Sequence, residues 1–145
     1  RVSLYHQAET LRINDAEERA NHPEMLIVGC FDPKAELPYA YREYLHSFAC
    51  PILKMSYESA EFSKMAINAF LIAQVETTNV LSNLAEKCEA DWNDVRKSLQ
   101  HDSRIGPNAY LDPGRWQASR HLLRDYVTLC NLDNPAKNFL AGVDL

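Results

Sequence analysis

The feature that most constrains the fold of this chain is a helical pattern that continues from about residue 57 to 87. Apolar residues occur around much of its circumference, which indicates that the helix is packed on several sides. These positions include Met65, Phe70, Val75, Val80, Leu81 and Leu84. Because helices in proteins are stabilised mainly by tertiary packing, the sequence predicts a domain built on one long helix.

A mixed pattern precedes the long helix. The run "MLIVGC" predicts a short buried strand over 25–30, and "PILKMS" predicts another over 51–56. The helices expected in this part cover 8–21 and 40–48. The first third of the chain is therefore interpreted as an α/β segment.

The helical pattern continues beyond residue 87. Asp91 is expected to cap a second helix, whose buried side holds Trp92, Val95 and Leu99. A third helix is expected over 115–131. Its expected buried residues are Trp116, Leu123, Val127 and Cys130. The predicted fold is mainly α, and a boundary near Ser56 separates an α/β part, residues 1–55, from an all-helical domain, residues 56–145.

Both ends have the pattern of a chain cut inside an element. The chain begins without methionine at "RVSLYHQAETL", where Val2 and Leu4 alternate like the tail of a strand. It finishes at "NPAKNFLAGVDL", where Asn134 and Pro135 have the pattern of a helix start. We therefore expect a fragment of a longer protein, and we expect the fragment alone to be inactive.

The composition argues against several classes of protein. With 145 residues, 46% hydrophobic and 24% charged, the chain is long enough to bury a core and too apolar for disorder. A net charge of -5 argues against a general nucleic-acid or anionic-membrane surface but allows a small anionic ligand. No apolar run reaches the roughly 18 residues of a membrane span, and no signal peptide begins the chain. The sequence predicts a cytoplasmic protein with no nucleic-acid or membrane partner.

The four cysteines are far apart and form no C-x-x-C motif. They are Cys30, Cys50, Cys88 and Cys130. This pattern predicts free thiols in a reducing cytoplasm. His46 and Cys50 are four residues apart, but Pro51 follows at once, and a histidine in the last turn of a helix is already favoured by the macrodipole. No metal site is expected.

Lys64 and Asn68 lie four residues apart in the most apolar section of the long helix, and therefore on one helical face. Lys64 alone is explained by a surface lysine whose stem covers apolar surface, and Asn68 alone by a helix-contact amide. Together, a lysine near a desolvated pocket can act as an acid, a base or an electrostatic clamp, while an amide orients a substrate hydroxyl. That chemistry suits the oxidation of an alcohol.

Three motifs give the chain a resemblance to a known family. They occur in "SAEFSKMAINAFLIAQVETTNVLSNLAEKCEADWNDV", followed by "DSRIGP" and "LDPG". This region resembles the central region of the UDP-glucose/GDP-mannose (nucleotide-sugar) dehydrogenase family, and "ETLRINDAEERANHPEMLIVGC" is similar to the stretch that closes its nucleotide-binding domain. The resemblance implies the C-terminal part of that domain over 1–55. Over 56–145 it implies a 6-phosphogluconate-dehydrogenase-like dimerisation domain.

The resemblance also implies a function and partners. The implied activity is the NAD-dependent oxidation of a nucleotide sugar, in polysaccharide biosynthesis, by a homodimer formed through the long helix 57–87. The sequence contains no G-x-G-x-x-G fingerprint. NAD is therefore expected to be bound mainly by a missing N-terminal domain.

Single residues inherit expected roles from the resemblance. Lys64 and Asn68 match a lysine and an asparagine that stabilise developing oxyanions and hold the ordered water or substrate. Glu9 matches the first glutamate of an E-x-L-x-E pattern, which takes part in proton transfer, while Ile13 replaces the second. Arg104 matches an arginine that reaches the nucleotide sugar in the neighbouring subunit. The simpler alternative is an arginine that binds loop carbonyls.

The chain departs from the family at "DPGRWQASRHLLRDYVTL", where the family has P-G-x-G-x-G-G-S-C-x-P-K-D. A gapless alignment from Gly114 places His121 at the nucleophilic cysteine and Arg124 at the lysine, a substrate-binding position, and it retains Asp125. The family's other glycines correspond to Trp116, Ala118 and Ser119. The backbone is therefore expected to approach a ligand less closely than in the family.

The missing cysteine affects the second oxidation step. A thiolate would trap the aldehyde and be converted into a thioester, and an imidazole does not readily replace it. His121 is one helical turn from Asp125, so the two could form a general base oriented by a carboxylate. The alternative is a histidine that fills space over a non-catalytic loop.

Three hypotheses follow. The first is an NAD-dependent nucleotide-sugar dehydrogenase without the cysteine-thioester step. The second is a non-catalytic dimerisation or binding domain derived from that family. The third is a β-hydroxyacid dehydrogenase, which also uses a K-x-x-x-N helix but has a glycine-rich run before the lysine, where "SYESAEFSK" has no glycine.

Overall fold

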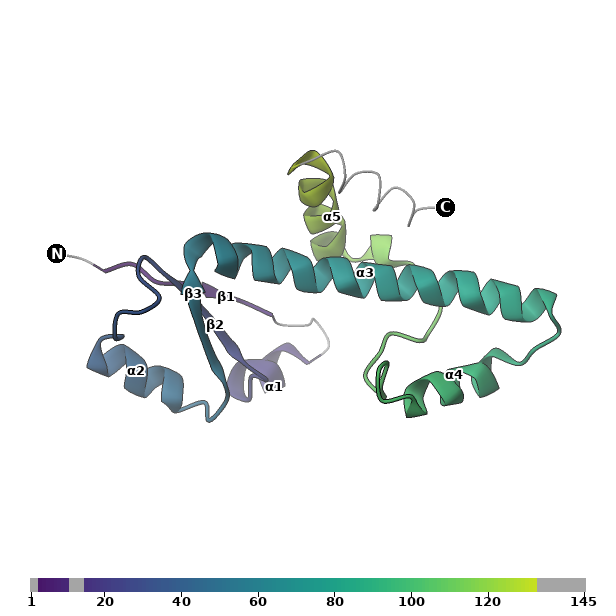
Figure 1. Ribbon diagram of the computed structural model, residues 1–145, viewed down its shortest axis with the longest axis horizontal. Coiled ribbons are helices and arrows are strands. Elements are labelled where there is room, and N and C mark those ends of the chain that lie inside the picture. Colours follow the sequence, from purple (N-terminus) through teal and green to yellow (C-terminus); the bar gives the residue numbers. More distant parts are fainter. Residues whose placement is uncertain (1–2, 11–14, 133–145) are drawn as a thin grey trace. The chain divides into compact units, whose positions relative to one another are not determined.

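The computed structural model describes residues 3–10 and 15–132 (Figure 1). The elements follow in the order β1 (His6–Ala8), α1 (Ala16–Asn21), β2 (Leu26–Cys30), α2 (Tyr39–His46), β3 (Ile52–Ser56), α3 (Tyr57–Lys87), α4 (Trp92–His101), η1 (Trp116–Ala118) and α5 (Arg120–Leu132). The prediction of a mainly helical chain with a short α/β part is confirmed.

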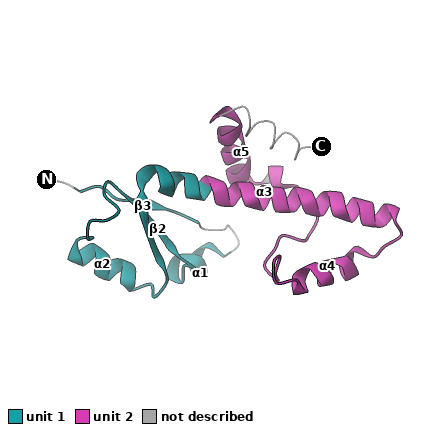
Figure 2. Ribbon diagram, viewed as in Figure 1, with its two compact units in different colours: residues 1–64 teal, residues 65–145 magenta. Residues whose placement is uncertain are grey.

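Two compact units divide the chain, residues 1–64 and residues 65–145 (Figure 2). Their boundary falls inside α3, so one helix contributes to both units. This division differs from the predicted domain boundary near Ser56, which stays a prediction.

The first unit contains a three-stranded sheet in the order β1-β2-β3. β1 is antiparallel to β2, with His6 opposite Gly29. β2 is parallel to β3, from Leu26 opposite Ile52 to Cys30 opposite Ser56. α2 lies between these two parallel strands in the sequence, as a parallel pair requires a crossover. The predicted strands over 25–30 and 51–56 and the predicted helix over 40–48 are confirmed.

β2 is the centre of this unit, because all five of its residues are buried. On one face, Leu26 and Val28 form an apolar cluster with Leu45 of α2. On the other, a Cβ added to Gly29 would come within 2.9 Å of the Ala60 Cβ in the first turns of α3. A strand covered on both faces has a continuous apolar run rather than alternation, which is why "MLIVGC" predicted it well.

The predicted helix over 8–21 is wrong in its first part. Ala8 belongs to β1, where it pairs with Ile27 and is buried, and the helix begins only at Ala16. Pairing with β2 overrides the local helical pattern, as tertiary context commonly does. Residues 11–14 of the predicted helix, Val2 and the helix start predicted at Asn134 lie outside the described residues.

The predicted long helix over 57–87 is confirmed without change as α3. It contains neither glycine nor proline. The helix ends where Glu89 adopts a left-handed backbone with φ 57, and the Ala90 N–H donates to the Ala85 carbonyl at 2.9 Å. This is the usual way in which a helix satisfies its last carbonyl groups.

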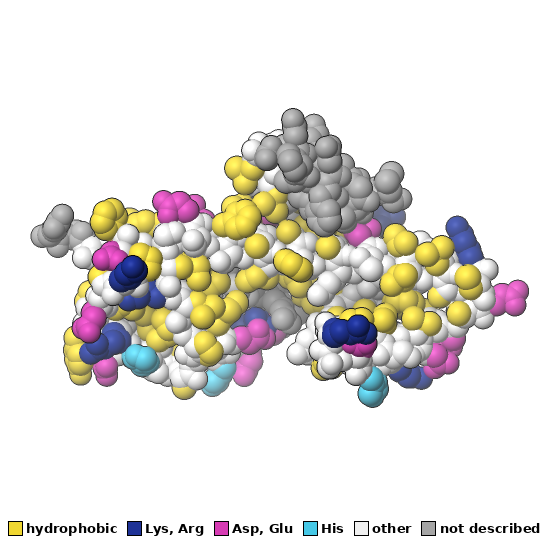
Figure 3. Space-filling model, in the orientation of Figure 1, with side chains coloured by type: hydrophobic (Ala, Val, Ile, Leu, Met, Phe, Trp, Pro, Cys, Tyr) yellow, Lys and Arg dark blue, Asp and Glu magenta, His cyan; other side chains and the backbone are white. Residues whose placement is uncertain are grey.

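The expectation that α3 is packed on several sides is confirmed only in part. Ile72, Val75 and Thr78 are buried, whereas Phe70 is 73% exposed. Val80, Leu81 and Leu84 are also exposed. The segment from Gly114 to Asp125 covers one side of the helix and the loop after α4 contacts another, but hydrophobic side chains remain visible along α3 in Figure 3.

The predicted cap of α4 is confirmed, because the Asp91 side chain accepts a hydrogen bond from the Asn93 N–H at 2.8 Å. The residues expected on its buried side, Trp92, Val95 and Leu99, are half-buried.

The predicted helix over 115–131 is interrupted. η1 ends at Ala118, Ser119 has an extended backbone, and α5 then begins at Arg120. Trp116 is buried as predicted, but Leu123 and Val127 are exposed. The buried residues of α5 are Asp125 and Leu129. The break changes which side of the helix faces inward, and periodicity counted across it was therefore misleading. Among the described residues, no helix is both long and apolar enough to cross a membrane.

Candidate active site

A buried carboxylate is the centre of the candidate site in the second unit. Asp125, on the inward side of α5, is 4% exposed. The Asn68 amide of α3 donates to its Oδ2 at 2.6 Å, and Arg124 Nε donates to its Oδ1 at 2.8 Å. A buried charged group is tolerated only where such partners compensate for lost water. The carboxylate therefore fixes the position of the Asn68 amide.

Arg124 binds Asp125 from the solvent side. Its side chain is 60% exposed, whereas that of Asp125 is 6% exposed. The hydrogen bond to Asp125 and the charge of that carboxylate raise the pKa of the Arg124 guanidinium. Arg124 thus compensates the buried charge while keeping part of its surface in water.

Lys64 lies on α3 one turn before Asn68, at the end of the first unit. Residues four apart on a helix share a face, so the ammonium and the amide follow one another along α3. Lys64 is half-buried, and it makes no hydrogen bond or ion pair with the residues from 3 to 10 and from 15 to 132. The predicted catalytic role of Lys64 stays a prediction.

His121 does not form the predicted pair with Asp125. Its imidazole is exposed, and it makes no hydrogen bond with the described part of the chain. The Asp125 oxygens instead accept hydrogen bonds from Asn68 and Arg124. Glu9 follows β1 in the first unit and is exposed. The structure therefore brings together three of the predicted site residues, Asn68, Arg124 and Asp125.

Arg104 lies in the loop after α4 and binds a carboxylate rather than loop carbonyls. Its Nε and Nη2 donate to Asp102 Oδ1 and Oδ2 at 3.0 and 2.7 Å. These hydrogen bonds lower the pKa of the Asp102 carboxyl and raise the pKa of the arginine. The Arg104 side chain is 86% exposed, so the pair holds the guanidinium at the surface.

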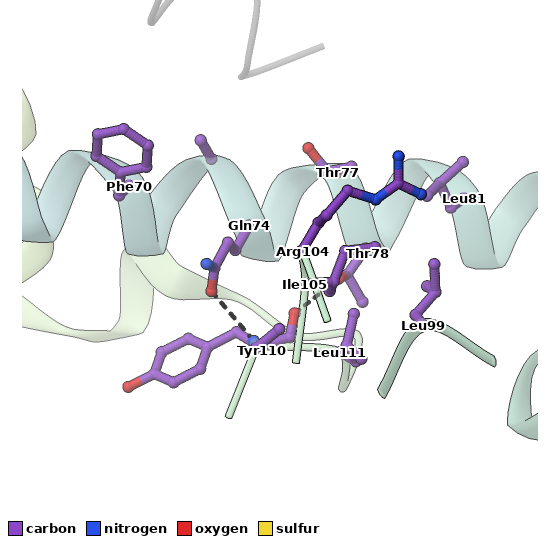
Figure 4. Close-up of a pocket in the computed structure, with 12 residues that line it drawn as sticks. Phe70, Gln74, Thr77, Thr78, Leu81, Leu99, Arg104, Ile105, Tyr110 and Leu111 are labelled. Atoms are coloured by element: carbon purple, nitrogen blue, oxygen red, sulfur yellow. Dashed lines mark hydrogen bonds between the residues drawn. The ribbon is translucent and has the colours of Figure 1, made fainter. Parts of the chain in front are cut away.

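A groove of about 320 Å³ lies next to Arg104, between α3, α4 and the loop that follows α4 (Figure 4). Its lining residues include Phe70, Gln74, Thr77, Thr78, Leu81, Leu99, Arg104, Ile105, Tyr110 and Leu111. Gln74 accepts from the Tyr110 N–H at 3.1 Å, and Thr78 donates to the Tyr110 carbonyl at 2.7 Å. The lining is thus mostly apolar, with the guanidinium at one border.

Sequence reasoning missed two residues of α3 that hold the site together, Glu76 and Asn79. Asn79 pairs with the backbone of Gly114, donating to its carbonyl and accepting from its N–H, each at 2.9 Å. The indole N–H of Trp116 donates to Glu76. One signal could have found them, because Glu76 and Asn79 lie on the same helical face as Asn68. No group of three potential metal ligands occurs among the described residues.

The comparisons with known proteins agree with this architecture. A sequence model of the UDP-glucose/GDP-mannose dehydrogenase family, central domain, matches residues 58–134. The chain is 32% identical over 105 residues to UDP-glucose 6-dehydrogenase YwqF of Bacillus subtilis, covering 72% of this chain and 23% of that protein. It is 45% identical over 111 residues to UDP-glucose 6-dehydrogenase 2 of Oryza sativa, covering 74% of this chain and 23% of that protein.

Two solved structures have the same fold. A UDP-glucose dehydrogenase from the hyperthermophilic archaeon Pyrobaculum islandicum superposes with a TM-score of 0.77 at 22% identity, over 97% of this chain and 33% of that chain. A GDP-mannose dehydrogenase from Pseudomonas aeruginosa, solved as a ternary complex, superposes with a TM-score of 0.61 at 21% identity, over 96% of this chain and 32% of that one.

The proteins named by these matches are dehydrogenases, which are oxidoreductases. This chain belongs to the UDP-glucose/GDP-mannose dehydrogenase family, and residues 58–134 correspond to its central domain. The chain spans about a quarter of the length of the curated relatives that it matches.

Proposed function

We propose that this chain is part of an NAD-dependent dehydrogenase that oxidises an alcohol group of a UDP- or GDP-activated sugar. The observation that carries the proposal is the hydrogen bond between the half-buried Asn68 amide and the buried Asp125 carboxylate. Both residues stand at positions where the family resemblance expects catalytic groups. Burying the Asp125 carboxylate removes it from water, which is energetically unfavourable. A helix contact with no other role would be served as well by two apolar side chains.

The chemistry proposed for α3 concerns the oxygen of the substrate. Oxidation of an alcohol removes a hydride from carbon and a proton from oxygen, so negative charge develops on the oxygen. The Lys64 ammonium would stabilise that charge, and the Asn68 amide, fixed by Asp125, would orient the oxygen or an ordered water. Fixed donors of this kind commonly contribute factors of about 10²–10³ to a rate. Glu9 is proposed to take part in proton transfer.

NAD, when bound, accepts the hydride. The sequence has no G-x-G-x-x-G turn, and the described sheet of the first unit has one parallel strand pair rather than a doubly wound set. The residues of this chain therefore do not by themselves fit the dinucleotide. We propose that NAD is held mainly by a part of the protein outside this chain.

The proposed reaction ends after one oxidation. His121 takes the alignment position of the family's cysteine nucleophile, and an exposed imidazole does not form the thioester on which a second oxidation depends. The expected product is accordingly an aldehyde rather than a uronic acid.

The proposed assembly is a cytoplasmic homodimer formed through α3, acting in polysaccharide biosynthesis and not on nucleic acid or membranes. Exposed apolar side chains along α3, among them Phe70 and Leu84, support this assembly, because large exposed apolar patches are uncommon on monomers. Arg104 is proposed to bind the nucleotide sugar of the neighbouring subunit, which requires its guanidinium to share or leave Asp102.

The test uses the full-length protein that contains this chain, incubated with NAD and a panel of UDP- and GDP-sugars. We expect NADH formation with at least one sugar and a product two hydrogens lighter than the substrate, identified by mass spectrometry. A uronic acid product would contradict the single oxidation. The 145-residue chain alone is expected to form no NADH.

A matched pair of substitutions tests the role of Lys64. Lys64→Ala should lower kcat by about 10²–10³ because it removes the proposed oxyanion partner, whereas Lys87→Ala, at the exposed end of the same helix, should change kcat less than about twofold. Tight sugar-nucleotide binding in calorimetry without NADH would instead support a non-catalytic binding domain.

A further inference from the structure

Trp116 is one of the most deeply buried side chains of the second unit, at 4% exposure. It forms an apolar cluster with Ile72 and Val75 of α3, and its indole N–H donates to the Glu76 carboxylate. A buried indole N–H needs such a partner to avoid an unsatisfied donor. Trp116 is therefore held on α3 by one polar and several apolar contacts.

Trp116 also contacts the inward side of α5. Leu122 and Tyr126 pack against the same cluster, and the Trp116 and Tyr126 rings lie 5.0 Å apart between centroids. Asp125 is adjacent to Tyr126 in the sequence and lies three residues after Leu122, so it shares this inward side. Trp116 thus lies between α3 and the turn of α5 that carries Asp125.

A single side of α3 binds the segment from Gly114 to Asp125. Asn68, Ile72, Glu76 and Asn79 follow one another at intervals of four, four and three residues, so they share one helical face. Asn79 binds Gly114, Glu76 binds Trp116, and Asn68 binds Asp125. The segment therefore runs along α3 in the opposite direction and is attached at three successive places.

We propose that Trp116 and Glu76 are positioning residues, which set the place of α5 on α3 and thereby hold the Asp125 carboxylate against the Asn68 amide. The catalytic consequence rests on the proposed function. The resemblance described above expects a glycine at position 116, which could not supply such an anchor. A displacement of about 1 Å in a catalytic group can cost roughly 10²-fold in rate, so even a partial loss of this anchor should be measurable.

The first experiment compares three variants of the full-length protein with wild type, and a fourth variant, Trp92→Phe, serves as the control. Trp116→Phe keeps an aromatic ring but removes the N–H, and Glu76→Leu removes the acceptor. Both should lower kcat about tenfold with KM unchanged within about twofold. Glu76→Gln keeps an oxygen acceptor and should restore kcat to within about twofold of wild type. An equal loss in Glu76→Gln and Glu76→Leu would overturn the proposal.

Trp92→Phe is the matched control. The chain has two tryptophans, and Trp92 also donates its indole N–H, to the Leu111 carbonyl at 3.1 Å. The same atoms are therefore removed in the same unit, but away from α5. Trp92→Phe should leave kcat within about twofold of wild type. A tenfold loss in this control would show a general response to tryptophan replacement and would overturn the proposal.

The second experiment does not depend on activity. Hydrogen–deuterium exchange of the amides in α5 is measured in Trp116→Phe, in Asn68→Ala and in the double variant. Each single substitution should raise exchange across 120–132, and the double variant should equal the larger single effect, because both release the same element. Independent, multiplicative effects or an unchanged α5 in Trp116→Phe would overturn the proposal. If the wild type forms no NADH, only the proposed function fails, and this experiment still decides.

Discussion

The sheet of the first unit and the segment from Tyr110 to Asp125 in the second unit are held by different forces. In the sheet, the buried residues are apolar, and Leu26, Val28 and Leu45 are each at most 6% exposed. In the segment, side chains of α3 and α4 form hydrogen bonds to the connection that leads from α4 to η1 and α5. The first region depends on burial of apolar area, and the second depends on polar contacts with fixed geometry in addition to the apolar cluster around Trp116.

The polar contacts come from both sides of the segment. α3 supplies Gln74 and Thr78 to the backbone of Tyr110. α4 supplies the Trp92 indole to the Leu111 carbonyl and Arg96 to the Asp112 carboxylate, one of whose two hydrogen bonds measures 3.3 Å. Together with the Asn79–Gly114 pair, these contacts bind the backbone of the connection at Tyr110, Leu111 and Gly114.

The difference between the regions has an energetic meaning. Burying a Leu or Val side chain contributes about 1.5–3 kcal/mol to the stability of the fold. This contribution changes little when the side chain moves slightly, because it depends on buried area and not on direction. A single hydrogen bond contributes only about 1 kcal/mol net, but leaving one buried partner unsatisfied costs about 1–3 kcal/mol. The sheet should therefore respond to lost volume, and the connection should respond to single lost atoms.

The largest expected effect is a cavity in the sheet unit. Leu45→Ala should lower the free energy of unfolding by about 2–5 kcal/mol, because Leu45 is fully buried against β2. Leu53→Ala removes the same atoms from β3, where the side chain is 41% exposed, and should cost less than half as much. Urea-induced unfolding followed by circular dichroism measures both. Equal losses would contradict the description of the sheet core.

The next effect concerns the polar attachment of the connection. Asn79→Ala removes both hydrogen bonds to Gly114 and should lower the free energy of unfolding by about 1–3 kcal/mol. Asn83→Ala, four residues further along α3, replaces an exposed asparagine and should change stability by less than about 0.5 kcal/mol. Because alanine has the higher helix propensity, Asn83→Ala should not destabilise the helix, and a loss as large as in Asn79→Ala would contradict the Gly114 contact as the cause.

A smaller effect is expected at the start of α4. Asp91→Ala removes the side-chain acceptor of the Asn93 N–H and should cost about 1 kcal/mol. Asp91→Asn keeps an acceptor and should stay within a few tenths of a kcal/mol of wild type. Amide exchange in the first turn of α4 reports the change locally. Unaltered exchange in Asp91→Ala would contradict the cap.

The smallest effect is the pH dependence of the exposed Asp102–Arg104 pair. Arg104 lowers the pKa of Asp102 in the folded chain. The carboxylate therefore contributes stability above its ordinary pKa near 4, and this stability is lost as the pH falls through the lower folded pKa. The stability difference between wild type and Asp102→Asn should shrink as the pH is lowered, and salt of about 1 M should reduce it. A difference that grows on acidification would contradict this sign.

Much of the fold was predictable because its signals are local. The apolar run of β2 and the uninterrupted pattern of α3 gave those elements their correct positions. β1 was not predicted, because Ala8 is placed in the sheet by its pairing with Ile27, far along the chain. The break at Ser119 was missed for a similar reason, since Trp116 is anchored to Glu76, forty residues earlier in the sequence.

The sequence predicted several residues of the candidate site but not the contacts between their side chains. The family resemblance named Asn68 and Asp125, but no pattern in the sequence predicts that their side chains meet at 2.6 Å. The expected partner of Asp125, His121, was chosen from helical spacing on α5 alone. One partner in the structure, Asn68, comes from α3, because the inward side of α5 faces that helix.

The contacts that Gln74, Thr78, Trp92 and Asn79 make with the connection all end on main-chain atoms, of Tyr110, Leu111 and Gly114. Bonds of this kind fix the path of a chain without specifying its side chains. During evolution, the side chains of such a connection can change while the path of its backbone stays the same. In this chain, Trp116 and His121 belong to a segment whose path along α3 is set by such contacts.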